Sequence, residues 1–222
     1  MASRAAKDAL FDGLAGVAKA LGNGRRAELV DVLSQGERSV EDLAGELDQS
    51  VANTSQHLQV LLRTGLVRTR RDGNHIIYAL TSPKVAALWA AVRGVAAEHV
   101  AELDRLAADY LGDRSALDLV TREELARRLR EGDVVVLDVR PEAEFAAGHI
   151  TGAVSVPVDQ LTRRLRNVLK DQDVVAYCRG QYCVYADEAV RTLTRRGYRA
   201  ARLEDGYPEW AAAGLPVEQA PA

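Results

Sequence analysis

The spacing of apolar residues predicts a series of helices in the first half of the chain. Apolar positions three to four residues apart place these helices over 4–22, 26–37, 38–48, 49–65 and 82–112. Ser39 is the expected N-cap of the third helix, because Asp42 follows it three residues later. Gly65 is expected to end the fourth helix. The fourth-helix residues expected to face the core are Val51, Leu58, Leu61 and Leu62.

A period of two replaces the helical spacing in LVRTRRDGNHIIYAL, residues 66–80. Alternation on both sides of Asp72-Gly73 predicts a β-hairpin, since this dipeptide favours a tight turn. Two helices joined by a short turn and followed by a hairpin have the order of a winged helix-turn-helix. The helix over 82–112 is apolar on more than one face, which indicates either a partner helix or packing on its own domain.

Strand and helix patterns alternate in the second half. Helices are expected over 118–132, 158–169, 185–197 and 206–214, with Thr121 as the N-cap of the first. Strands are expected in DVVVLDV, AVSVPV, DVVAYC and YRAARLE. This order predicts an α/β domain with a central parallel sheet covered on both faces. Since the helical pattern breaks at 112–115, we expect two domains: a mainly α winged-helix domain over 1–112 and the α/β domain over 113–222.

Composition and charge add limits to this picture. Of the 222 residues, 27% are charged and 47% hydrophobic, which is typical of globular proteins. No apolar run approaches the roughly eighteen residues of a membrane span, and the N-terminus lacks an apolar signal core, so we expect a cytoplasmic protein without membrane contact. The net charge is −3, yet residues 63–71 hold four arginines and no acid. They form a candidate phosphate-binding patch or a solvated strand pair.

Residues 39–80, SVEDLAGELDQSVANTSQHLQVLLRTGLVRTRRDGNHIIYAL, resemble the ArsR-type family of dimeric winged-helix repressors. The resemblance implies that the helix over 50–62 enters the major groove of a palindromic operator. It also implies a homodimer built by the helices near 4–22 and 84–111. On the groove helix the implied contacts to bases or phosphates are Ser50, Asn53, Thr54, Gln56 and His57. On the hairpin the implied contacts to the DNA backbone are Arg68, Arg70 and Arg71.

The usual sensor of that family is missing from this sequence. Many members sense soft metals or arsenite through cysteines near the first of the two reading helices, and EDLAGEL here holds none. A second family site on the last helix uses Asp, His and Glu. His99 and Asp104 are spaced five residues apart, which favours a polar surface over a zinc site. We therefore expect no metal and no cofactor.

Three segments of the second half resemble a single rhodanese domain over about 116–218. They are LDVRPEAEFAAGHITGAVSVPV (137–158), YCRGQYC (177–183) and DGYPEWAAAGLPV (205–217). The resemblance implies sulfur transfer with Cys178 as nucleophile, and it makes Arg179 a candidate contact for an anionic donor such as thiosulfate. The whole chain resembles the fusion class of ArsR-type regulators that carry a rhodanese domain.

The loop between the expected strand and helix holds both cysteines of the chain, Cys178 and Cys183. Backbone N–H groups of residues 179–184 are expected to curl around Cys178 and to lower the pKa of its thiol. A thiolate there would attack a sulfane sulfur and become a persulfide. The remaining loop residues expected to support this chemistry are Gly180, Gln181, Tyr182 and Val184.

Details of the loop separate related chemistries. A phosphatase-like or arsenate-reducing loop would need arginine at position 184, where this chain has Val184. Gln181 and Tyr182 carry no charge, so persulfide or polysulfide donors fit as well as thiosulfate. Cys183 is either a resolving thiol for Cys178, a small buried helix cap, or half of a metal site.

Other residues of the rhodanese-like segments have structural expectations. Asp138 and Arg140 either pair and brace the loop or form a surface salt bridge. His149 is expected to be a hydrogen-bonded structural residue and Trp210 a core residue.

These features together predict a DNA-binding repressor that responds to sulfane sulfur or oxidants through Cys178. One alternative is a thiosulfate or persulfide sulfurtransferase with an accessory DNA-binding domain. The other is a constitutive DNA-binding protein with a scaffold-like rhodanese domain.

Overall fold

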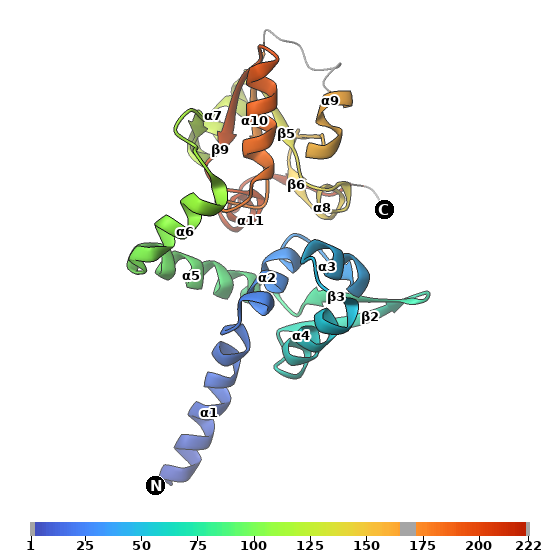
Figure 1. The fold of residues 1–222 in the computed structure, drawn as a ribbon, viewed down its shortest axis with the longest axis vertical. Coiled ribbons are helices and arrows are strands. Elements are labelled where there is room, and N and C mark those ends of the chain that lie inside the picture. Colours follow the sequence, from blue (N-terminus) through green and yellow to red (C-terminus); the bar gives the residue numbers. More distant parts are fainter. Residues whose placement is uncertain (1–2, 165–171, 221–222) are drawn as a thin grey trace. The chain divides into compact units, whose positions relative to one another are not determined.

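The computed structural model describes residues 3–164 and 172–220, which form two compact units, Met1–Val95 and Ala96–Ala222 (Figure 1). The first unit has one hydrophobic core, and the second has a core on each face of its sheet. Across the described residues, every helix is too short or too polar to pass through a bilayer.

The first unit is the winged helix-turn-helix that the sequence predicts. Its helices are α1 (Arg4–Leu21), α2 (Gly24–Leu33), α3 (Val40–Glu46), α4 (Val51–Arg63) and the start of α5 (Pro83–His99). Its strands are β1 (Arg38–Ser39), β2 (Val67–Asp72) and β3 (His75–Leu80), in the sheet order β1-β3-β2. Ser39 caps α3 as expected, since its Oγ accepts a hydrogen bond of 3.1 Å from the backbone N–H of Asp42.

The core of this unit lies where α2, α3 and α4 meet. Leu29, Leu43, Leu58 and Leu61 are fully buried there. Val51 was expected among the core residues of α4, but it is 44% exposed. Val51 is the first residue of α4 and lies one turn before the buried residues of this helix, which begin at Thr54.

Two details of the first half differ from the sequence prediction. The pairing of Asp72 with His75 leaves Gly73-Asn74 as the two-residue turn, one position beyond the expected Asp72-Gly73. Gly73 has φ 56°, a left-handed conformation that suits glycine. The single helix expected over 82–112 is two helices, α5 and α6 (Ala101–Leu111), because Val100 is non-helical with φ −101° and ψ 90°.

The second unit contains the predicted parallel sheet, with strand order β4-β9-β8-β5-β7. These strands are β4 (Leu119–Val120), β5 (Val134–Asp138), β7 (Val154–Ser155), β8 (Asp173–Tyr177) and β9 (Arg199–Leu203). A separate antiparallel pair joins β6 (His149–Ile150) to β10 (Val217–Glu218). The helices after α6 are α7 (Arg122–Glu131), α8 (Glu142–Ala147), α9 (Leu161–Arg164), α10 (Tyr185–Arg195) and α11 (Tyr207–Ala212).

Helices cover both faces of this sheet (Figure 1). Val174 and Ala176 of β8 belong to the core under α10, whereas Val175 and Tyr177 belong to the opposite core, which includes Trp210. Successive side chains of a strand point to opposite faces, so a strand covered on both sides is apolar throughout. The helix predicted over 158–169 is present as a 3-10 turn, η1 (Val158–Gln160), followed by α9, and its last part lies outside the described residues.

Candidate functional site

Both thiols lie in the loop between β8 and α10. This loop leaves the carboxyl end of a central parallel strand, which is where open α/β sheets usually bind ligands. The loop turns on itself, since the N–H of Cys183 donates to the carbonyl of Gly180 over 3.1 Å, and Gly180 has φ 143°. Val184 precedes the first residue of α10 and is the helix N-cap, without a side-chain hydrogen bond.

The two sulfurs occupy different surroundings. Cys178 is only 1% exposed, and its Sγ lies 3.8 Å from the carbonyl oxygens of Gly180 and Cys183. Cys183 is partly exposed, and both cysteines are free thiols. Each thiol influences the pKa of the other, which places the two side chains next to one another. The reactive groups are therefore a buried thiol and a more accessible one beside it.

The pKa of Cys178 is shifted in the direction opposite to the sequence expectation. Burial raises the pKa of Cys178 well above its usual range, and the hydrogen bonds from the backbone of Gly180 and Ala186 only partly offset this. The hydrogen bond from Cys178 instead lowers the pKa of Cys183 to about 7, aided by backbone hydrogen bonds from residues 179 and 185. Of the backbone amides of residues 179–184 that were expected around Cys178, that of Gly180 bonds to it, together with the amide of Ala186 outside that range. The first negative charge of the pair resides on Cys183.

Arg179 was expected to contact an anionic donor, but its side chain is held in an ion pair instead. Its guanidinium lies against the fully buried carboxylate of Glu144 on α8, with Nη2 2.5 Å and Nε 3.0 Å from Oε1. The Arg179 side chain is 11% exposed and also covers the ring of Tyr185 at 5.3 Å. A bidentate buried pair of this kind is costly to open, so Arg179 serves to anchor the loop and to place a positive charge near Cys183.

Asp138 and Arg140 form an ion pair. Of the two sequence expectations, the pair that braces the loop agrees with the structure and the surface salt bridge does not, because both side chains are fully buried. Arg140 donates from Nε over 2.9 Å and from Nη2 over 2.5 Å to the Asp138 carboxylate, and from Nη2 over 2.7 Å to the carbonyl of Gly148. Tyr177, the residue before Cys178, donates its hydroxyl to the same carboxylate over 2.6 Å. This network fixes the end of β8 from which the thiol loop begins.

Residues elsewhere in the rhodanese-like segments behave as expected. His149 is buried, its Nδ1 lies 2.9 Å from the carbonyl oxygen of Phe145, and the two rings stack. Trp210 is a core residue. Gln181 is exposed and Tyr182 partly exposed, so the loop presents two uncharged side chains to its surroundings.

Several residues that contact the loop were not found from the sequence. Gly206 lies so close that a β-carbon there would collide with the backbone of Arg179 and Gly180. Arg114 donates to the carbonyls of Gln181 and Cys183. The glycine at position 206 in the DGYPEW segment is a sequence signal for close backbone approach. Arg114 had no such signal, because it lies in a stretch that was expected to be a domain boundary.

The expected DNA-reading residues lie mostly on one exposed side of α4. Ser50, Asn53 and Gln56 are exposed, and His57 is partly exposed. Thr54 is wrong as a DNA contact: it is fully buried, and its hydroxyl donates to the carbonyl of Ser50 over 3.1 Å. The position faces the core because it lies one turn before Leu58 on the buried stripe.

The arginines of the hairpin differ in their surroundings. Arg68, Arg70 and Arg71 are all exposed on β2, as expected. The guanidinium of Arg70 is held by Glu37 and by Asp72, the latter at 2.8 Å. Arg71 donates from Nε to the carbonyl of Gly73 over 3.2 Å. A phosphate would therefore have to compete with two carboxylates for Arg70.

Comparisons with known proteins agree with this two-part organisation. The model of the bacterial regulatory protein, arsR family, matches residues 23–69, and the rhodanese-like domain model matches residues 121–213. The HTH-type transcriptional regulator Rv0324 of Mycobacterium tuberculosis is 47% identical over 213 residues, which cover 96% of this chain and 93% of that protein.

Partial relatives match one half each. A sulfurtransferase of Allochromatium vinosum is 37% identical over 100 residues, 44% of this chain and 92% of that protein. The solution structure of the homodimeric winged helix-turn-helix DNA-binding domain of Mb0332 from Mycobacterium bovis is 43% identical and covers 45% of this chain and 90% of that chain, with a TM-score of 0.42. Since the relative from M. tuberculosis matches across nearly its full length, the chain belongs to the ArsR-type winged helix-turn-helix transcriptional regulators that carry a C-terminal rhodanese domain.

Proposed function

We propose that this regulator is a repressor whose operator affinity changes when the thiol pair of its rhodanese domain takes up sulfane sulfur or is oxidised. The observation that carries the proposal is that Cys178 and Cys183 are neighbours within one short loop, with the Sγ of Cys178 3.8 Å from the carbonyl oxygen of Cys183. A bond between two sulfurs requires them to be neighbours, and a thiol with a pKa near neutrality is ready to react.

The proposed DNA contacts come from α4 and β2. The exposed side chains of Asn53 and Gln56 have the amide groups that pair with adenine edges in the major groove. Ser50 caps α4, since its Oγ accepts a hydrogen bond from the N–H of Asn53 over 3.2 Å, so it fixes the start of the reading helix. Arg68 and Arg71 extend the contact to phosphates. In this proposal Arg70 supports the hairpin through Glu37 and Asp72.

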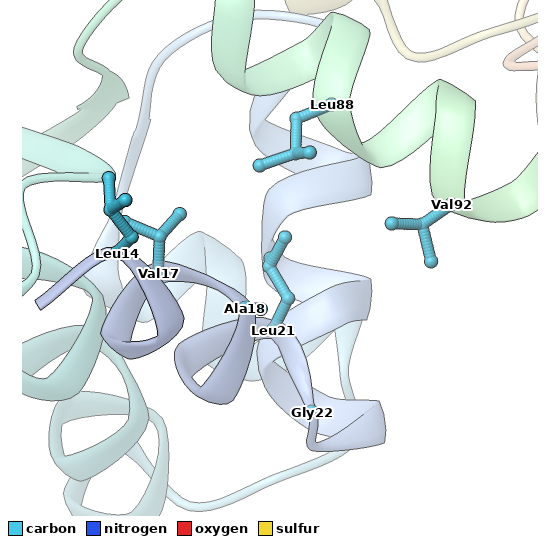
Figure 2. A pocket seen from close by; sticks show the side chains of 7 residues that line it. All are labelled: Leu14, Val17, Ala18, Leu21, Gly22, Leu88 and Val92. Carbon is cyan, nitrogen blue, oxygen red and sulfur yellow. The ribbon is translucent and has the colours of Figure 1, made fainter. Parts of the chain in front are cut away.

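A second copy of the chain is the proposed partner of α1 and α5. Leu10, Phe11 and Leu14 of α1 are each 58–61% exposed, which a lone helix in water does not favour. A groove lies between the second half of α1 and α5, and it is lined by Leu14, Val17, Ala18, Leu21, Gly22, Leu88 and Val92 (Figure 2). A two-fold dimer would cover the exposed leucines and present two reading helices to a palindrome.

Light scattering tests this dimer. The wild-type chain is expected to have twice its 24.1 kDa mass, and Leu14→Glu is expected to reduce it to the mass of one chain. Leu119→Glu is the matched control, because Leu119 is as exposed as Leu14 but lies on β4 of the second unit. A wild-type monomer at micromolar concentration would refute the dimer.

The proposed reaction begins with a proton transfer within the pair. The Cys183 thiolate takes the proton of Cys178, and the Cys178 thiolate attacks the outer sulfur of a donor R–S–SH. The S–S bond of the donor breaks, R–S⁻ leaves with the proton from Cys183, and a Cys178 persulfide forms. Because Cys178 is buried, the donor reaches it only when the loop opens.

Resolution of the persulfide completes the reaction. Cys183 attacks the Sγ of Cys178, the terminal S–S bond breaks, and hydrosulfide leaves. A Cys178–Cys183 disulfide forms, and two electrons pass from the thiol pair to the donor sulfur. The new covalent bond restrains the loop, so its conformation and its contacts with the rest of the domain change.

Gel-shift titrations and intact-protein mass spectrometry test this proposal together. The probe is a DNA duplex selected by the wild-type protein from a random library. Polysulfide is expected to change wild-type affinity at least fivefold, with a mass decrease of about two hydrogens in the disulfide state. Cys178→Ser and Cys183→Ser are expected to bind DNA normally without responding. An equal response in either variant would refute the role of the pair.

A sulfurtransferase is the second candidate, favoured by the similarity of the second half to the sulfurtransferase of A. vinosum. In that function Cys183 would not close a disulfide, and an acceptor would remove sulfur from the Cys178 persulfide. Rapid turnover of thiosulfate with cyanide, lost in Cys178→Ser but kept in Cys183→Ser, would support it. Insensitivity of DNA binding to polysulfide in the same preparation would decide for the enzyme.

A further inference from the structure

We infer that Arg114 is a positioning residue that ties the conformation of the thiol loop to the segment following α6. This inference rests on the proposed function, since it takes Cys178 and Cys183 as the responding groups. Arg114 lies three residues after the end of α6, and 64 residues separate it in sequence from Cys178.

One guanidinium makes three contacts with the loop and the start of α10. Arg114 donates from Nη1 to the carbonyl of Gln181 over 2.7 Å and from Nη2 to the carbonyl of Cys183 over 3.2 Å. Its Nε lies 2.5 Å from the carboxylate of Asp187. Planar, multidentate contacts of this kind fix orientation as well as distance.

The anchor of this guanidinium is itself rigid. Asp187 is fully buried in the first turn of α10, where a negative charge is favoured by the helix dipole. Its second oxygen lies 3.4 Å from Nε of Arg202, a buried residue of β9. Asp187 therefore holds Arg114 in place, and the two loop carbonyls are the contacts free to change.

The segment around Arg114 is also attached to the same domain. Arg191 of α10 donates to the carbonyl of Asp113 over 2.7 Å, and the N–H of Ser115 donates to the Asp113 carboxylate over 2.8 Å. The N–H of Leu117 donates to the carbonyl of Arg114 over 3.0 Å. A change at the loop carbonyls is thus transmitted through Arg114 to an ordered segment rather than absorbed by a loose one.

The thiol reaction changes these contacts. A Cys178–Cys183 bond requires the sulfurs to approach to about 2.05 Å. Such a movement shifts the backbone of Cys183, whose carbonyl oxygen is held by Arg114 on one side and lies 3.8 Å from the Cys178 sulfur on the other. Arg114 therefore stabilises the reduced loop, and closing the bond weakens its hold. Through α6 and α5, which continue the chain toward the winged-helix unit, the altered segment biases DNA binding.

The test compares Arg114→Gln with Arg191→Gln in the full-length protein. Arg191 is the matched control because it holds the same segment at Asp113 without a hydrogen bond to the loop carbonyls. The first measurement is the dithiol–disulfide equilibrium of the protein in mixtures of reduced and oxidised dithiothreitol, read by thiol trapping and mass spectrometry. In this exchange two electrons and two protons pass from the protein thiols to oxidised dithiothreitol. The second is the affinity ratio of the reduced and oxidised protein for the selected DNA duplex.

Arg114→Gln is expected to shift the dithiol–disulfide equilibrium about tenfold toward the disulfide. The reason is that the substitution removes charge-assisted hydrogen bonds that stabilise the reduced loop and not the disulfide loop. The affinity ratio is expected to fall at least threefold toward unity. Arg191→Gln is expected to change both quantities less than twofold. Arg114→Lys, which keeps the charge beside Asp187, serves if Arg114→Gln does not fold, and the same shift is expected because lysine does not reach both carbonyls.

An equilibrium within twofold of wild type in the Arg114 variants would overturn the inference. So would an equal shift in Arg191→Gln, or a wild-type protein that forms no disulfide at the most oxidising ratio. If the wild-type affinity for DNA ignores polysulfide while Arg114→Gln still shifts the thiol equilibrium, the proposed function fails and the positioning role of Arg114 stands.

Discussion

Removing the thiol of Cys178 is expected to slow the reaction of Cys183 with alkylating reagents. The hydrogen bond from Cys178 is the largest cause that lowers the pKa of Cys183 to about 7. With Cys178→Ala that donor is gone, while the positive charge of Arg179 and the burial that opposes it both remain. At pH 7 the thiolate fraction is roughly one half for a pKa of 7 and about 3% for the ordinary value near 8.5. Since only the thiolate reacts, a full return to the ordinary pKa would slow the reaction about fifteenfold. The backbone hydrogen bonds and Arg179 still lower the pKa of Cys183, so we expect a rate about fivefold to fifteenfold lower.

The assay is the pH dependence of iodoacetamide alkylation, with Cys183 identified by peptide mass spectrometry. Cys178→Ser is the matched control, because its hydroxyl is similar in size to the thiol and still donates a hydrogen bond. Its inflection is expected to stay closer to that of the wild type. In the wild type itself, Cys183 is expected to react before the buried Cys178. An unchanged inflection in Cys178→Ala, or faster labelling of Cys178 in the wild type, would refute the assignment of the charge to Cys183.

Three further substitutions test the supports of the site and the DNA surface. Arg140→Met leaves Asp138 buried without its cation and is expected to reduce the free energy of unfolding by roughly 3–5 kcal/mol in urea titrations, and a loss under about 1 kcal/mol would contradict a buried pair. Gly206→Ala forces a methyl group into the loop backbone, so we expect a loss of about 1–3 kcal/mol and a shifted alkylation profile, whereas a wild-type profile would show that the loop does not depend on this contact. Arg68→Gln is expected to reduce the slope of log affinity against log salt concentration by about 0.9. Arg70→Gln is expected to leave this slope nearly unchanged, because the Arg70 guanidinium is already held by two carboxylates. Equal slopes in the two variants would contradict this distinction.

The order of helices and strands follows from local patterns, and so it was predictable. Helical spacing, the cap at Ser39 and the alternation on either side of the hairpin all depend on neighbours within a few residues. The boundaries of the elements were not predictable to the residue, because a shift of one residue changes where a turn or a helix end falls. The tight turn moved to Gly73-Asn74, and Val100 interrupts a run that the sequence alone reads as one helix.

The assignment of surface residues failed where a helix face was misjudged. Thr54 and Val51 exchanged their expected sides of α4. Threonine tolerates burial when its hydroxyl bonds to the backbone of the preceding turn, and a valine at a helix start is exposed when no neighbouring element reaches it. Polarity alone does not distinguish these cases, since both depend on which elements pack against α4.

Local sequence patterns were enough to predict the two-domain organisation, the family of each half and the loop in which the thiols lie. The sulfur that carries the charge and the residues that hold the loop became known from the folded chain, because burial and long-range ion pairs have no signal in local spacing. Glu144 meets Arg179 across 35 positions of the chain, and Arg114 meets Cys183 across 69. The pKa of a thiol depends on its distance from water and from other charges, and these distances exist only once the chain has folded.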